Sequence, residues 1–106
     1  MIIILNKDNY EQEIEQSALP VLIDISATWC GPCQQMKPIM EQLAKELEGK
    51  YKFAEVNVDE SRDLAIKFGV TSVPTFVFIK NKQIKGKERG YMPAADLKAK
   101  IEEYLG

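Results

Sequence analysis

The segment Trp29-Cys30-Gly31-Pro32-Cys33 decides how the rest of the chain is interpreted, because it holds both cysteines of the protein. The preceding segment Val21-Leu22-Ile23-Asp24-Ile25 is almost wholly apolar and predicts a strand buried on both faces. The residues after Cys33 repeat at helical spacing, so the cysteines are expected on the first turn of a helix that follows this strand. Cysteines at positions i and i+3 share one helix face and can reach each other.

The start of a helix favours a reactive thiol. Unpaired backbone N–H groups and the positive end of the helix dipole lie there, and both stabilise a thiolate. The thiolate is the nucleophile in thiol–disulfide exchange. The segment therefore predicts a dithiol that cycles with a disulfide.

Three other kinds of site could use the two cysteines. A zinc site needs about four ligands, and the chain has no His and no further Cys. A structural disulfide across so short a loop would remove little entropy from the unfolded chain. Two inert core cysteines are the third alternative, although Gly31 and Pro32 at a helix start argue against burial. A C-x-x-C motif between a strand and a helix favours the redox interpretation.

Length, charge and hydropathy narrow the class of protein. A chain of 106 residues is expected to form one domain, over residues 1–106. Its net charge of −2 argues against a nucleic-acid partner. The apolar residues 1–5 have no basic leader and are too short for the core of a signal peptide, and no segment approaches a membrane span. We therefore expect a reducing, cytoplasmic compartment, where cysteines are more often catalytic than structural.

The remaining pattern alternates strands with helices. Asp8 and Glu11 have the spacing of a capping box at the start of the first helix. The expected strands cover residues 2–5, 21–26, 51–59, 75–79 and 83–89, and the expected helices cover residues 8–17, the cysteine pair to residue 49, 61–68 and 93–105. This βαβαβαββα order predicts an α/β fold with a mostly parallel sheet and helices on both faces. The tight turn at residues 80–83 makes the last two strands antiparallel.

The residues around the cysteine pair resemble the active-site segment of bacterial members of the thioredoxin family. The similarity runs from Asp24 to Cys33 and continues at Pro38, Val73-Pro74-Thr75 and Gly90, so it covers essentially the whole chain. It implies the thioredoxin fold, a five-stranded mixed sheet flanked by four helices, and a monomeric protein-disulfide reductase that carries electrons from a thioredoxin reductase. Family-typical substrates are ribonucleotide reductase, peroxiredoxin and methionine sulfoxide reductase. No cofactor, metal or membrane partner is expected.

Individual residues also receive roles. Cys30 is expected to be the nucleophile, and Cys33 is expected to resolve the mixed disulfide. Asp24 is expected to be buried, to have a raised pKa and to take a proton from Cys33, the alternative being an exposed or edge position. Gly31 leaves room for a substrate, and Pro32 stiffens the first helical turn. In the resemblance, this Gly-Pro pair marks the reducing members.

A substrate groove is expected beside the cysteines. Trp29 could be a packed aromatic or a platform for substrate, and the resemblance favours the platform. The resemblance also implies a cis Val73–Pro74 bond, with the backbone of Val73 able to pair with an extended substrate chain. Gly90 and Tyr91 would form another wall of the groove.

Three positions depart from the bacterial pattern. Ser26 stands where a second tryptophan is common, Gln34 stands where a lysine often follows the second cysteine, and Glu55 replaces a lysine near the buried aspartate. The first two should leave the chemistry intact, whereas Glu55 changes the electrostatics around Asp24. A non-redox assembly or binding subunit, and an oxidase or isomerase domain, are the alternative functions. The intact cysteine pair argues against the former, and the Gly-Pro pair argues against the latter.

Overall fold

A five-stranded sheet forms the centre of the computed structural model, which describes residues 1–106. Its strands are β1 (Ile2–Ile4), β2 (Val21–Ser26), β3 (Lys52–Asn57), β4 (Thr75–Lys80) and β5 (Gln83–Arg89), in the order β1-β3-β2-β4-β5. The first three are parallel, and β4 pairs antiparallel with both β2 and β5. The expected mixed sheet is therefore confirmed.

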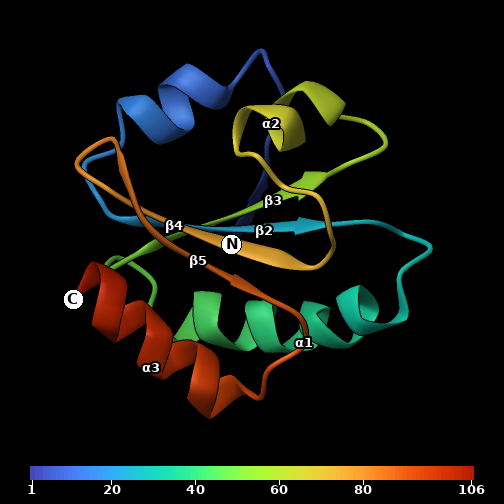
Figure 1. Ribbon diagram of the computed structural model, residues 1–106. Helices are drawn as coiled ribbons and strands as arrows, with labels where there is room; N and C mark the ends of the chain where they lie inside the picture. The colour runs from blue at the N-terminus through green and yellow to red at the C-terminus, as the bar shows by residue number, and fades with distance from the viewer.

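Four helical segments cover the two faces of this sheet. They are η1 (Glu11–Glu15), a short segment of π type, α1 (Gly31–Glu46), α2 (Arg62–Lys67) and α3 (Ala94–Leu105). Figure 1 shows α1 and α3 on one side of the sheet, and α2 with the blue segment η1 on the other. None of the helices is both long enough and apolar enough to span a membrane.

Strand β2 is buried along its whole length because helices lie against both of its faces. Side chains alternate across a strand, so Ile23 and Ile25 pack into the core layer that includes residues of α2, whereas Leu22 packs against α1 and α3. The same alternation puts Asp24 on the side of Leu22. A carboxyl group is therefore directed toward α1, the helix that begins at the cysteine pair.

The first helical segment begins differently from the prediction. Asn6 Oδ1 accepts hydrogen bonds from the backbone N–H groups of Asp8 (2.8 Å) and Asn9 (3.1 Å), and Asn9 Oδ1 accepts one from the N–H of Asn6 (2.9 Å). Asn6 and Asn9 thus cap each other's backbone N–H groups in the turn before η1, whose own N-cap residue, Tyr10, makes no side-chain cap hydrogen bond. The predicted box of Asp8 and Glu11 was wrong because both pairs have the same spacing, and Asn and Asp are equally good caps.

Gly86 lets α3 approach β5 closely. A Cβ atom at this position would overlap the ring of Tyr104, whose centroid lies 4.8 Å from that of Phe78. The Tyr104 hydroxyl donates a hydrogen bond to Glu88 Oε2 at 2.6 Å, which holds the ring in place. The ring therefore fills the space that the absent side chain leaves.

We expect Gly86→Ala to destabilise the protein by about 1–3 kcal/mol, because the ring of Tyr104 must move away from the strand. Urea unfolding of the oxidised protein measures the difference. In a Tyr104→Ala background the same substitution should cost little, since no ring remains to be displaced. An equal cost in both backgrounds would contradict the packing explanation.

Candidate functional site

The two cysteines lie where β2 leads into α1. Cys30 is the N-cap residue of α1, with extended backbone angles, and Cys33 is in the first helical turn. Their sulfurs form a disulfide, and their Cα atoms are 5.2 Å apart. Cys30 is 7% exposed and Cys33 is 0% exposed, so both are more buried than the sequence suggested. A sulfur atom that approaches from solvent therefore reaches Cys30 first.

The surroundings of Cys30 favour a negative charge on its sulfur. The backbone N–H of Cys33 donates a hydrogen bond to Cys30 Sγ at 3.2 Å. In the dithiol form the same N–H and the positive end of the α1 dipole stabilise a Cys30 thiolate. Pro32 lies within the first turn, where its missing N–H leaves no hydrogen bond unmade.

Gln34 fixes the loop that precedes the cysteines. Its side-chain amide donates hydrogen bonds to the carbonyl oxygens of Ala27 (3.3 Å) and Thr28 (3.1 Å). This contact ties the end of β2 to the first turn of α1. Sequence reasoning missed it because the acceptors are backbone groups, which no residue type reveals.

The residues expected to form the substrate groove lie beside Cys30. The Val73–Pro74 peptide is cis, as predicted, and the carbonyl oxygen of Val73 lies 3.8 Å from Cys30 Sγ. The N–H of Gly90, a residue with φ of +89°, donates to the carbonyl oxygen of Pro74 at 2.9 Å. Tyr91 follows Gly90 and is 49% exposed. Two chain segments far apart in sequence therefore meet next to the disulfide.

Trp29 is exposed rather than packed in the core. Its side chain is 69% exposed, and its indole N–H donates a hydrogen bond to Asp59 Oδ2 at 2.9 Å. Trp29 and Val73 line one hollow of about 460 Å³, and the carbonyl oxygen of the same Val73 lies beside Cys30 Sγ. The ring is thus oriented by Asp59, a residue that sequence reasoning did not identify.

Asp24 is buried, and the alternative of an exposed or edge position was wrong. It is 2% exposed, and its Oδ1 atom has no hydrogen-bond partner. Burial, followed by the negative charge of Glu55, raises the pKa of Asp24 to about 7, and the positive charge of Lys37 partly opposes this rise. Glu55 lies directly opposite Asp24 in the parallel pairing of β2 with β3.

Glu55 is held by two side chains. Lys37 Nζ from α1 lies 3.1 Å from Glu55 Oε1, and the Ser26 hydroxyl donates to the same oxygen at 3.2 Å. A lysine from α1 therefore places a positive charge next to the Glu55 carboxylate. Sequence reasoning missed Lys37, although it lies four residues after Cys33 and therefore on the same helix face.

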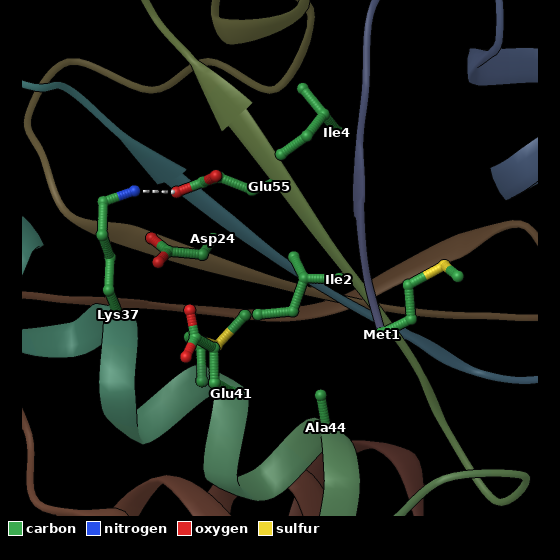
Figure 2. A pocket seen from close by; sticks show the side chains of 9 residues that line it. Met1, Ile2, Ile4, Asp24, Lys37, Glu41, Ala44 and Glu55 are labelled. Atoms are coloured by element: carbon green, nitrogen blue, oxygen red, sulfur yellow. Dashed lines mark hydrogen bonds and ion pairs between the residues drawn. The ribbon is translucent and has the colours of Figure 1, made fainter.

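A second hollow, of about 360 Å³, lies between α1 and the β1–β3 edge of the sheet. Figure 2 shows Asp24, Glu55 and Lys37 close together in it, with the ion pair of the last two drawn as a dashed line. The other lining residues are Met1, Ile2, Ile4, Met40, Glu41 and Ala44. This hollow shares no residue with the hollow beside Trp29.

Comparison with known proteins gives one consistent family. A family model described as Thioredoxin matches residues 1–103. The chain is 41% identical to a chloroplastic M-type thioredoxin of Pisum sativum (96% of this chain, 59% of that protein) and 39% identical to chloroplastic thioredoxin M4 of Arabidopsis thaliana (95% and 52%). It is 36% identical to a thioredoxin of Haemophilus influenzae, over 95% of this chain and 94% of that protein.

The chain thus spans little more than half the length of the two chloroplast relatives and nearly the whole bacterial one. The family match, the α/β fold and the disulfide at the start of α1 agree with one another. The chain belongs to the thioredoxin family and carries the dithiol–disulfide redox pair of that family at Cys30 and Cys33.

Proposed function

We propose that this chain is a protein-disulfide reductase and electron carrier. The observation that carries the proposal is the disulfide at the start of α1, with Cys30 the more exposed of its two residues. In the reduced form the Cys30 thiolate attacks a substrate disulfide, which forms a mixed disulfide and releases one substrate thiolate. Cys33 then attacks Cys30 Sγ and releases the second substrate thiolate. Two electrons have then passed to the substrate, and Cys30 and Cys33 are joined by a new disulfide.

The resolving step needs a base inside the protein, because Cys33 is fully buried. Asp24 serves as this base in the proposal. It is buried on the α1 side of β2, and a carboxyl with a pKa of about 7 is suited to accept a proton near neutral pH. The proton passes directly or through one water molecule.

The substrate is an extended protein segment that lies across the groove beside Cys30. Trp29 and Tyr91 offer exposed aromatic surface, and the backbone of Val73 offers hydrogen bonds to an extended chain. Pro74 and Gly90 shape the floor of the groove. Gly31 and Pro32 keep the approach to the sulfur clear. The space around Gly31 is open, since an added Cβ there would meet no atom within 4 Å.

Family membership implies disulfide-containing substrates and a reductase as general partners. We propose thioredoxin reductase as the electron donor and ribonucleotide reductase, peroxiredoxin and methionine sulfoxide reductase as candidate substrates. In this proposal residues 1–106 act as one monomeric domain in a reducing, cytoplasmic compartment.

An insulin reduction assay with dithiothreitol tests the proposed function. The wild-type chain should accelerate precipitation of the insulin B chain, because Cys30 attacks the insulin disulfides faster than the small dithiol does. Cys30→Ser should react at the rate of dithiothreitol alone. A wild-type chain that gives no acceleration would contradict the reductase proposal and favour a binding subunit instead.

A further inference from the structure

The hollow between α1 and β1 offers Asp24 a connection to solvent that is separate from the substrate groove. A base that takes up the Cys33 proton must later pass it on, yet Asp24 Oδ1 has no protein partner and the residue is 2% exposed. Asp24 lines this hollow and does not line the hollow beside Trp29. A substrate held on Cys30 covers the groove, so proton exchange during that step needs another side of the molecule.

Glu55 lines the same hollow as Asp24 and is the more exposed of the two. Its side chain is 19% exposed, whereas that of its partner Lys37 is 42% exposed. Both hydrogen bonds that the Glu55 side chain accepts, from Lys37 and Ser26, go to Oε1. Oε2 thus has no protein partner and can take up or release a proton through water in the hollow.

We propose that Glu55 relays protons between Asp24 and solvent through the hollow beside α1, and that Lys37 and Ser26 position its carboxylate for this task. The inference rests on the proposed reductase function. In the relay, a proton leaves Asp24 for Glu55 Oε2, by way of water, and then passes to bulk solvent; no redox change accompanies these transfers. Glu55 and Lys37 are positioning and relay residues, since neither touches the reacting sulfurs.

Few other ionisable groups face Asp24. On α1 these are Lys37, the resolving thiol Cys33 and Glu41, which lines the same hollow. Strand β3 contributes Glu55, and the residue of β4 opposite Asp24 is Phe76, which does not titrate. Strand β1 contributes the apolar side chains of Ile2 and Ile4 to the hollow, and the preceding residue Met1 also lines it. The ion pair of Lys37 and Glu55, drawn as a dashed line in Figure 2, is therefore the charged pair that lies next to Asp24.

Opposite substitutions in this pair should move the pH profile of thiol reactivity in opposite directions. Glu55→Gln keeps a hydrogen-bond acceptor for Lys37 but removes a negative charge, so it lowers the pKa of Asp24. The increase of the thiol reaction rate with pH should therefore begin at a lower pH than in the wild-type protein. Lys37→Gln removes a positive charge, so it raises that pKa and moves the profile to higher pH. Lys37→Arg keeps the positive charge and should therefore keep the wild-type pH profile. Glu41→Gln, a substitution in the same hollow, should also leave the profile unchanged.

The relay itself is tested by the dependence of the rate on buffer. The prereduced protein is mixed with a disulfide substrate in a stopped-flow instrument, and the reaction is followed by the fluorescence of Trp29, the only tryptophan. In dilute buffer Glu55→Gln should be slower than wild type near neutral pH, and added imidazole should restore its rate by carrying the proton. The wild-type rate should not depend on imidazole concentration.

Two results would overturn the inference. One is a Glu55→Gln variant whose rate does not depend on imidazole, and the other is a pair of Glu55→Gln and Lys37→Gln profiles that shift in the same direction. In either case the proposed reductase function survives if the wild-type chain still accelerates insulin reduction. Thermal unfolding of each variant confirms that the compared proteins are folded.

Discussion

Replacing Cys33 with serine is expected to leave Cys30 bonded to its substrates as stable mixed disulfides. The first attack uses Cys30, which is the more exposed residue of the pair and whose sulfur accepts the hydrogen bond from the Cys33 N–H. The second attack needs the sulfur of Cys33, and a hydroxyl cannot replace it because it is not ionised near neutral pH. Cys33→Ser used as bait in a lysate should therefore yield adducts that dithiothreitol releases.

The reciprocal variant is the control for this trap. Cys30→Ser should capture few proteins, because the remaining thiol of Cys33 is fully buried. Limited alkylation of the reduced wild-type protein, followed by peptide mapping, should label Cys30 first for the same reason. Equal capture by both variants, or predominant labelling of Cys33, would reverse the assignment of nucleophile and resolving thiol.

The sequence predicts the fold well where one physical signal is enough. The apolar run of β2 predicts its burial on both faces, and the repeat of Leu97, Ile101 and Leu105 predicts α3, whose inward face holds those residues. The start of the first helical segment was placed wrongly because two capping pairs overlap there. Periodicity does not predict the strand order, because that order depends on contacts between segments far apart in the chain.

The functional site also contains residues that the sequence identified and residues that it did not. The spacing of the cysteines and the lone charge in β2 pointed to Cys30, Cys33 and Asp24 directly. Glu55 was noticed as an unusual charge near Asp24, but its partner Lys37 and the partner of Trp29, Asp59, could not be found because each lies far along the chain from the residue it contacts. Lys37 and Glu55 are 18 residues apart, and Trp29 and Asp59 are 30 residues apart. Only the packing of α1 on β3, and of the loops around Trp29, brings these pairs together.

Asp24→Asn is expected to stabilise the oxidised protein at neutral pH. Folding raises the pKa of Asp24 from an ordinary value of 3.8 to about 7, so the ionised carboxyl costs the native state free energy. A pKa difference of about three corresponds to about 4 kcal/mol, which is the upper limit of the expected gain. The same variant should slow reductase turnover, because the amide cannot accept the proton of Cys33.

The pH dependence of this gain separates ionisation from packing. Below the unfolded pKa of 3.8 both states hold the proton, and the cost of Asp24 is absent; it grows as pH rises toward about 7 and is complete above that value. Urea unfolding of the disulfide form should therefore show a larger gain for Asp24→Asn at about pH 8 than at about pH 5. Asp8→Asn, at an exposed position, should show little gain at either pH. An equal gain at both pH values would assign the effect to packing, and an Asp24→Asn variant less stable than wild type at about pH 8 would reject the buried acid itself.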